Sequence, residues 1–211
     1  MRIPRELEAG YRRFREERFI GEAERYRALA KGQQPETMII ACADSRVDPA
    51  SIFSAAPGQL FVVRNVAALV PPFEETGTYH GTSAALEFAV VELKVANIVV
   101  MGHGMCGGIA AALAGADQRP VGKFIGPWVG MLADIRDPLL ASGKQDLRNL
   151  PPKVLERLAV KHSLENMMGF PFVRSAIEQG HLTLHGAWFS IAEGELEWLD
   201  WRTGSFAPIR V

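Results

Sequence analysis

Short apolar runs alternate with stretches of helical spacing over the first half of the chain. The apolar runs at residues 37–41, 60–64 and 97–101 have the length of strands, and they are typical of strands that are buried in a sheet. A stretch of helical spacing follows each run, and the clearest one covers residues 82–94. This order of strand, helix, strand, helix, strand, helix predicts parallel strands joined by right-handed crossovers.

Both ends of the chain depart from this pattern. Residues 4–31 predict a long helix, in which Leu7 and Tyr11 begin an apolar stripe among many Arg and Glu residues. Such a helix either lies solvated on the core or forms an arm that packs on a second subunit. Near the other end, strands at residues 182–191 and 195–199 flank a Glu-Gly turn, which is a β-hairpin signal.

Together these elements predict a single α/β domain over residues 1–211. We expect a mostly parallel central sheet with flanking helices, an amino-terminal helical arm over residues 1–31 and a carboxyl-terminal antiparallel hairpin. Three further helices are predicted at residues 127–135, 152–168 and 171–179.

The composition is that of an ordinary globular protein, with 48% apolar residues, 22% charged residues and a net charge of −1. The balanced charge gives no indication of a nucleic-acid partner, and no run reaches the roughly 18–20 apolar residues of a membrane span. The first residues lack the apolar core of a signal peptide, so the expected location is cytoplasmic. Two cysteines cannot form a disulfide framework. In a reducing compartment such a pair binds metal, takes part in catalysis or is simply buried.

Both cysteines and one histidine follow strand ends. Cys42 ends the first predicted strand, and His103 and Cys106 follow the third strand through a glycine turn. Because the carboxyl ends of parallel strands share one edge of a sheet, we expect the three side chains to meet there. Two thiolates and an imidazole favour zinc, and three protein ligands leave one tetrahedral position open, as in catalytic zinc sites. Taken alone, the spacing is also consistent with small buried cysteines and a hydrogen-bonded histidine.

Asp44 and Arg46 lie two and four residues past Cys42. Asp44 is in reach of the same metal, either as its fourth ligand in a closed state or as the acceptor from a bound water. Arg46 can hold that carboxylate with two hydrogen bonds. The pair therefore predicts a switch beside the open position, although an ordinary surface ion pair would need no metal. An open zinc lowers the pKa of its bound water toward neutrality and makes hydroxide available as a nucleophile.

Residues 102–107 also match the dinucleotide-binding pattern G-x-G-x-x-G, between a strand and a helix. No strand that ends in an acidic residue follows about 20 residues later, as such a site requires. The motif also lies on the third strand rather than the first. These two departures count against a dinucleotide site.

Several longer motifs make the chain similar to a known family. They are Cys42-Ala-Asp-Ser-Arg46-Val, Pro57-Gly-Gln-Leu-Phe-Val-Val-Arg-Asn-Val66-Ala, Ala84-Ala-Leu-Glu-Phe88-Ala-Val, Leu93-Lys-Val-Ala-Asn-Ile-Val-Val-Met-Gly-His103-Gly-Met-Cys106-Gly-Gly and Pro171-Phe-Val-Arg. In this order they resemble the β-class carbonic anhydrases over nearly the whole chain. The spelling around Lys31-Gly-Gln is closest to the plant-like branch of that family.

The resemblance implies a zinc lyase that reversibly hydrates carbon dioxide to bicarbonate and a proton by zinc-bound hydroxide, with one Zn²⁺ per chain. Cys42, His103 and Cys106 would hold the zinc, and Asp44 and Arg46 would form the gating pair. The resemblance also implies a homodimer or a higher even oligomer, with the amino-terminal helix reaching across the partner.

A substrate pocket is also implied. In the plant-like branch a glutamine nine residues before the first cysteine, here Gln33, donates a hydrogen bond to a substrate oxygen. The resemblance assigns the apolar side of the pocket to Phe61, Val66 and Phe88, which suits a small uncharged substrate. The alternatives are hydrolysis of carbonyl sulfide or carbon disulfide by the same zinc site, and a non-catalytic zinc-binding regulatory protein.

The chain departs from the family pattern at several positions. Gly104 and Met105 replace a pair that contains serine, so a local hydroxyl is lost but no ligand is lost. Glu92 stands where plant members often have a histidine credited with proton transfer, which implies slower proton export or direct use of buffer. Ile39 replaces the tryptophan of a regulatory bicarbonate site, so we expect that site to be absent.

Overall fold

The structure, a computed structural model, describes residues 3–76, 80–116, 121–141 and 152–210. The chain divides into two compact units, Met1–Gln34 and Pro35–Val211. The first unit corresponds to the predicted arm over residues 1–31, and the second unit holds the sheet. The expected single domain over residues 1–211 stays a prediction.

The amino-terminal unit is helical over most of its length. Its segments are α1 (Arg5–Arg13), the π-helical turn η1 (Phe14–Arg18) and α2 (Phe19–Leu29). The ring centroid of Phe14 lies 5.6 Å from that of Tyr26. Among the described residues of these three segments none is buried, so the unit has no core of its own. Leu7, Tyr11 and Ile20 are more than half exposed in the single chain.

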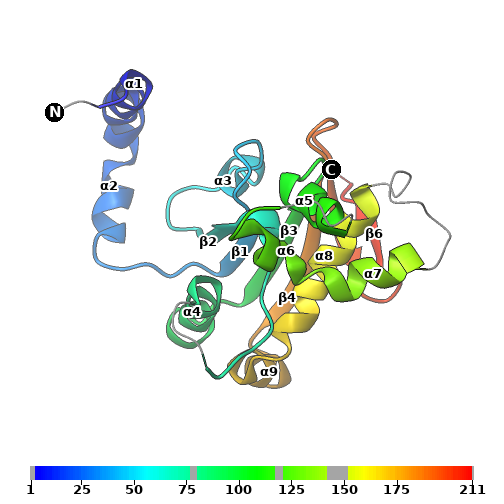
Figure 1. The fold of residues 1–211 in the computed structure, drawn as a ribbon. Coiled ribbons are helices and arrows are strands. Elements are labelled where there is room, and N and C mark those ends of the chain that lie inside the picture. The colour runs from blue at the N-terminus through cyan, green and yellow to red at the C-terminus, as the bar shows by residue number, and fades with distance from the viewer. Residues whose placement is uncertain (1–2, 77–79, 117–120, 142–151, 211) are drawn as a thin grey trace. The chain divides into compact units, whose positions relative to one another are not determined.

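The second unit contains a six-stranded sheet with the strand order β2-β1-β3-β4-β5-β6 (Figure 1). The strands are β1 (Thr37–Cys42), β2 (Leu60–Asn65), β3 (Asn97–His103), β4 (Thr183–Phe189), β5 (Leu196–Asp200) and β6 (Ser205–Pro208). The four strands β2, β1, β3 and β4 are parallel, whereas β5 and β6 add antiparallel pairs. The predicted α/β fold with a mostly parallel sheet and a carboxyl-terminal hairpin is confirmed. The sequence pattern does not predict β6, because its four residues include a proline and show no apolar run.

The register of the parallel strands brings two chain segments to one edge of the sheet. Cys42 is level with Asn65 of β2, and Ala41 is level with Met101 of β3. Strand β3 continues past Met101 and ends at His103. Because parallel strands end at the same edge, Cys42 and His103 leave the sheet on neighbouring strands.

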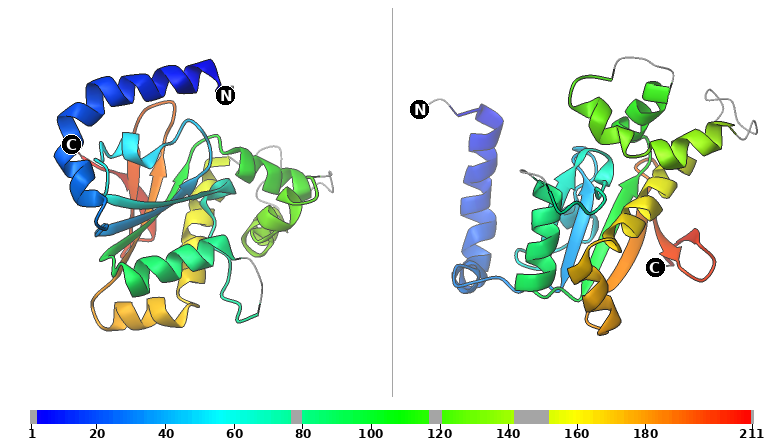
Figure 2. Two further views of the ribbon diagram at one scale, coloured as in Figure 1. Left: turned by 90° about the vertical axis from the view of Figure 1, so that its left-hand side faces the viewer. Right: turned by 60° about the horizontal axis from the view of Figure 1, so that its bottom comes forward.

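Helices follow the strands in the predicted alternation (Figure 2). They are α3 (Pro49–Ile52), α4 (Gly81–Glu87), α5 (Gly107–Ala116), α6 (Ile125–Gly130), α7 (Ala133–Ala141), α8 (Pro152–Met167) and α9 (Pro171–Glu178), with the short turns η2 (Val66–Ala68) and η3 (Phe88–Glu92). The helix predicted over residues 82–94 is α4 followed by the π-helical turn η3. The helix predicted over residues 127–135 is two helices, α6 and α7. No helix in the described part of the chain is long and apolar enough to cross a membrane.

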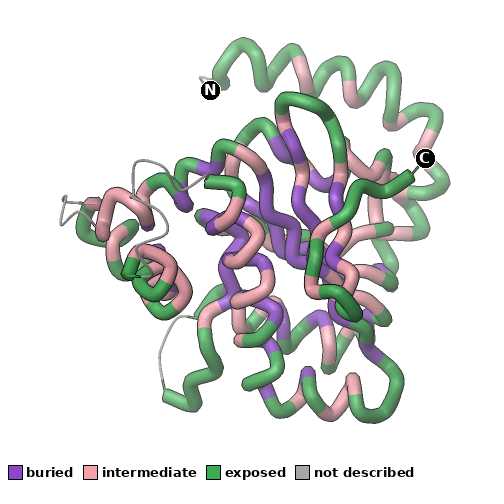
Figure 3. The backbone as a smooth tube through the Cα atoms, turned by 90° about the vertical axis from the view of Figure 1, so that its right-hand side faces the viewer, coloured by how far each residue is buried: buried purple, intermediate pink, exposed green. Residues whose placement is uncertain are grey.

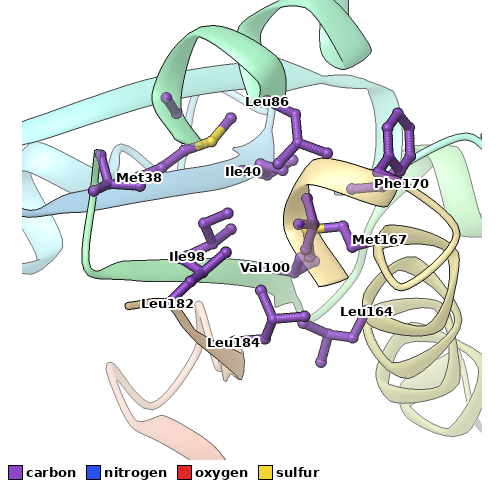
Figure 4. Packing of buried hydrophobic residues seen from close by; sticks show 14 of the residues in the cluster. Met38, Ile40, Leu86, Ile98, Val100, Leu164, Met167, Phe170, Leu182 and Leu184 are labelled. Atoms are coloured by element: carbon purple, nitrogen blue, oxygen red, sulfur yellow. The ribbon is translucent and has the colours of Figure 1, made fainter. Parts of the chain in front are cut away.

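The main core lies between the sheet and helices α4, α8 and α9 (Figure 4). Met38 and Ile40 of β1 join it, together with Leu164 of α8. The alternate residues Ile39 and Ala41 belong to a smaller cluster on the opposite face of the sheet. The central strands are therefore buried on both faces (Figure 3), which explains why their sequences are unbroken apolar runs.

Candidate metal centre

Three side chains that can bind a metal meet at the carboxyl edge of the sheet. Cys42 is the last residue of β1, His103 is the last residue of β3, and Cys106 immediately precedes α5. A glycine in the turn between the last two avoids crowding, because a Cβ at Gly104 would lie only 3.1 Å from the ring of Trp188. The turn can therefore approach β4 closely, and it carries His103 and Cys106 toward Cys42.

The ligand atoms of these three residues are close together and shielded from solvent. The Sγ atoms of Cys42 and Cys106 are 3.9 Å apart. Both sulfur atoms and a ring nitrogen of His103 lie within 4.8 Å of one another. The three residues are between 1% and 5% exposed, and both cysteines are free. One chain therefore assembles a complete Cys2His group.

The protonation of His103 fits a metal ligand. Its Nδ1 lies 2.9 Å from the carbonyl oxygen of Gly104, and because a carbonyl only accepts, Nδ1 carries the proton. Nε2 then has a free lone pair, and it is buried without a hydrogen-bond partner among the described residues. A buried nitrogen of this kind is costly unless a ligand satisfies it. Together with two thiols it completes a donor set that zinc prefers.

The thiols themselves also favour a cation. The hydrogen bond from Cys106 outweighs burial and lowers the pKa of Cys42 to about 4. The same contact, together with burial, raises the pKa of Cys106. The contact between the two sulfur atoms thus favours the thiolate form of Cys42, and the thiolate is the form of cysteine that binds metal.

Asp44 and Arg46 form a pair beside this group. Arg46 donates from Nε to Asp44 Oδ1 at 2.9 Å and from Nη2 to Asp44 Oδ2 at 2.7 Å. Asp44 Oδ2 lies 3.9 Å from His103 Nε2, so the carboxylate faces the metal group. The hydrogen bonds from Arg46 hold the pKa of Asp44 well below its ordinary value of 3.8. Asp44 is thus an anion that can accept but not donate.

Arg46 also connects the two segments that carry the ligands. Its Nη2 donates to the carbonyl oxygen of Met105 at 3.1 Å, in the turn that follows β3. Met105 adopts a positive φ of 57°, a conformation that costs free energy for a residue with a side chain. The bond to Arg46 helps to hold the turn in this conformation.

Arg64 of β2 is a supporting residue that the sequence analysis does not identify. Its Nε donates to the carbonyl oxygen of Cys42 at 2.9 Å, and its Nη2 donates to the carbonyl oxygens of Asp44 at 2.5 Å and of Val47 at 3.3 Å. The guanidinium therefore braces the loop that carries one metal ligand and the carboxylate. In the sequence, Arg64 is a single charged residue at the end of an apolar run. This shows that the residue is unusual, but it does not show which groups its side chain contacts.

Val66 and Gln33, two of the residues assigned to the substrate pocket, lie in different units of the chain. Val66 directly follows β2 and touches the start of α5, since a Cβ at Gly108 would lie 2.8 Å from Val66 Cγ1. Val66 is therefore on the same edge of the sheet as the metal group. Gln33 belongs to the amino-terminal unit, so its role stays a prediction.

The two aromatic residues assigned to that pocket contact each other. The ring centroids of Phe61 and Phe88 are 5.9 Å apart. Phe61 pairs with Met38, four residues before Cys42 on β1, and four residues of strand span about 13 Å. Within one chain this aromatic pair is therefore displaced along the sheet from the metal group.

The chain matches a family model and a curated relative. Residues 37–196 match the family model described as carbonic anhydrase. Over 184 residues the chain is 37% identical to β carbonic anhydrase 5, chloroplastic, of Arabidopsis thaliana. This match covers 87% of the chain and 60% of that relative, so the chain spans about three fifths of the relative's length.

The chain is also similar to solved structures of β-carbonic anhydrases. The structure of the β-carbonic anhydrase CcaA matches with a TM-score of 0.88 and 30% identity, over 97% of this chain and 98% of that one. A tetrameric β-carbonic anhydrase from Sordaria macrospora matches with a TM-score of 0.72 and 30% identity, over 96% of this chain and 94% of that one.

Proposed function

Because this chain belongs to the β-carbonic anhydrase family, we propose that it catalyses the reversible hydration of carbon dioxide to bicarbonate and a proton. The observation that carries the proposal is the position of Asp44. Its Oδ2 lies 3.9 Å from the unpartnered Nε2 of His103. Three buried ligands alone are consistent with a structural metal, whereas an ionised carboxylate held beside them is suited to orient a nucleophile.

We propose that Cys42 Sγ, His103 Nε2 and Cys106 Sγ bind one Zn²⁺ per chain. Thiolate and imidazole donors select zinc over magnesium or calcium, and three protein ligands leave a fourth position for the reaction. When bound, zinc supplies hydroxide as a nucleophile near neutral pH. The hydrogen bond from His103 Nδ1 to Gly104 fixes the imidazole ring so that Nε2 faces the two thiolates.

Asp44 would accept a hydrogen bond from the nucleophile and so direct its lone pair at the carbon of the substrate. Arg46 keeps the carboxylate ionised and prevents it from rotating, because it binds both oxygens. If Arg46 releases Asp44, the carboxylate is close enough to become the fourth ligand of the metal. Such a closed state would exclude the nucleophile.

For the substrate pocket we propose Gln33 as the hydrogen-bond donor and Phe61, Val66 and Phe88 as the apolar wall. Because Phe61 and Phe88 are displaced from the metal group of their own chain, we infer that they complete the pocket of a second copy. Phe61 lies on β2, an edge strand of the sheet, and Phe88, the first residue of η3, is 44% exposed. A homodimer or higher even oligomer would provide this second copy.

Two further observations support association. The amino-terminal helices have no buried residue among those described, and the matched protein of Sordaria macrospora is described as tetrameric. The cytoplasmic location expected from the sequence stays a prediction, since the Arabidopsis relative is described as chloroplastic.

Stopped-flow measurement of proton release on mixing with carbon dioxide, with zinc quantified in the same preparation, tests the proposal. We expect one zinc per chain and rapid hydration. A preparation that holds zinc but hydrates carbon dioxide no faster than buffer, both at neutral pH and at a higher pH that would open a closed site, would leave the metal site and refute the activity. Faster turnover of carbonyl sulfide or carbon disulfide would instead identify a hydrolase.

A further inference from the structure

A buried carboxylate on α8 contacts the backbone of one of the three metal-binding residues. Glu156 lies in α8 and is only 3% exposed. Its Oε1 accepts a hydrogen bond from the backbone N–H of Cys106 at 3.2 Å. Its Oε2 accepts one from the indole N–H of Trp188 at 3.1 Å. Both oxygens are thus directed at donors and not at the metal group.

The surroundings of Glu156 show that this arrangement is unusual. Its carboxylate takes part in none of the salt bridges of the described residues, and a buried charge without such a partner is costly. Two cations lie over the ring of its partner Trp188: Lys153 Nζ and Arg157 Cζ are each 4.6 Å from the ring centroid. Both of these residues form salt bridges with Glu197. An apolar side chain of similar size would fill the same space without the cost of burying a carboxylate. We therefore expect the carboxylate to have a specific role.

The N–H that Glu156 binds belongs to Cys106, the residue immediately before α5. The carbonyl oxygen of Cys106 accepts the first hydrogen bond of this helix, from Ala110 N at 3.0 Å. The backbone N–H groups of Ile109 and Gly108 face the sulfur of Cys106 and partly oppose the rise in its pKa. The direction of the Cys106 sulfur therefore depends on how the backbone of Cys106 is held.

Helix α8 is packed closely against the end of β3. A Cβ at Gly102 would lie 2.8 Å from Val160 Cγ2 and 3.4 Å from the carbonyl oxygen of Glu156. These contacts fix the distance between α8 and β3, but they are apolar or backbone contacts without direction. Glu156 provides directed hydrogen bonds at this interface.

We propose that Glu156 is a positioning residue, which holds the backbone of Cys106 so that its sulfur meets Cys42 Sγ and His103 Nε2 in the geometry of a metal site. The inference rests on the proposed function, because it presupposes that these three residues bind zinc. Glu156 acts on the metal only through Cys106. Partners that orient metal ligands in this way affect metal affinity or activity by about 10–100-fold.

The E156Q variant tests this role with almost no change in size. A glutamine side chain has one acceptor oxygen, so its NH₂ group must face either Cys106 N–H or Trp188 N–H, which are both donors. We expect zinc to dissociate from E156Q about 10–100-fold faster than from the unmodified protein, measured by transfer to a chromophoric chelator. The absorption bands of the cobalt-substituted protein should also shift, because the Cys106 sulfur changes position.

A second substitution gives a specific rescue. In W188F the indole donor is gone, and in the double variant E156Q/W188F the glutamine oxygen can accept from Cys106 while its NH₂ group no longer faces an N–H. The E156Q change should therefore accelerate zinc release much less in the W188F background than in the unmodified protein. E165Q, which removes an exposed carboxylate from the same helix, is the matched control and should leave zinc release unchanged.

The outcomes separate this inference from the proposed function. An unmodified protein that binds no zinc would refute the metal site itself. A protein that binds zinc, with E156Q releasing it within twofold of the unmodified rate and with an unchanged cobalt spectrum, would refute the role of Glu156. If E156Q does not fold, E156D replaces it, because the shorter side chain cannot reach both donors. Unchanged zinc release from E156D would equally overturn the inference.

Discussion

Both carboxylate oxygens of Asp44 accept hydrogen bonds from the guanidinium of Arg46, at 2.9 and 2.7 Å. The backbone N–H of Arg46 adds a third bond, to Oδ1 at 3.0 Å. These bonds restrict rotation of the carboxylate while its Oδ2 stays 3.9 Å from His103 Nε2. The arginine thus controls how the carboxylate faces the metal group, which makes the pair the first target for mutation.

Replacing Arg46 with lysine should lower kcat for carbon dioxide hydration by about 100-fold, because misplacing a catalytic group by about 1 Å can have an effect of that size. Lysine keeps the positive charge but cannot bind both oxygens of Asp44 and also the carbonyl oxygen of Met105. Stopped-flow hydration and zinc content measure the two consequences separately. Zinc content should not change, since no ligand is touched.

The chain contains a matched control for this experiment. Arg202 binds Asp200 with the same two-residue spacing, through its backbone N–H, Nε and Nη2, at an exposed turn. R202K should leave both kcat and zinc content unchanged. Equal activity of R46K and R202K would contradict the assigned role of Arg46.

Replacing Asp44 with asparagine should lower kcat by about 10²–10⁴-fold, the range associated with loss of a group that takes up or orients a proton in the transition state. The amide has nearly the same size, but it places an NH₂ group where an anionic oxygen faces His103. Zinc should again be retained. A D44N protein with unmodified kcat would show that the carboxylate has no part in the reaction, and D200N serves as the control for carboxylate removal.

The metal group itself follows from the sequence because its geometry is a property of strand ends. Cys42 and His103 end neighbouring parallel strands, and Cys106 is three residues further along a glycine turn. Any sheet with this strand order brings the three together. The fold class is predictable for the same reason, since apolar runs of strand length mark the central strands.

The residues around the metal group are less predictable, because their roles depend on side-chain direction across long sequence separations. Arg64 is 22 residues from the carbonyl that it binds, and Glu156 is 50 residues from the N–H that it binds. A contact between residues so far apart in the sequence produces no periodic pattern that could reveal it. Phe61 and Phe88 show a related problem, because a resemblance assigns them to a pocket without indicating which copy of the chain they serve.

Removing zinc should abolish hydration and lower the midpoint of thermal unfolding. A ligand that binds only the folded state stabilises it by about 2.7 kcal/mol when its free concentration is 100 times its dissociation constant. Metal-free protein would also leave His103 Nε2 buried without a partner. Calorimetry before and after chelation measures the change, and added Zn²⁺ should restore both properties whereas Mg²⁺ should not. C42S should behave like the chelated protein in the presence of Zn²⁺, and a stable, active C42S would exclude Cys42 as a ligand.

The cap of α3 should make part of the stability depend on pH. Asp48 accepts hydrogen bonds from the Ser51 hydroxyl at 2.7 Å and from the Ser51 N–H at 2.9 Å. These bonds lower the pKa of Asp48 below its ordinary value of 3.8. A carboxyl whose pKa is lowered by folding stabilises the folded state above its unfolded pKa, and this contribution is lost as the pH falls through the folded pKa. Replacement of a capping aspartate with alanine costs about 1 kcal/mol of stability.

We therefore expect D48A to unfold at a lower urea concentration than the unmodified protein near neutral pH. The difference should shrink at pH values below 3.8, the ordinary pKa of the carboxyl group, because Asp48 is then increasingly protonated. Asparagine also caps helices well, so D48N should retain more stability than D48A near neutral pH while losing the pH dependence. D134A removes an exposed carboxylate from the first turn of α7 and should change the urea midpoint little. A D48A difference that is the same at both pH values would show that the ionised form of Asp48 contributes nothing to the cap.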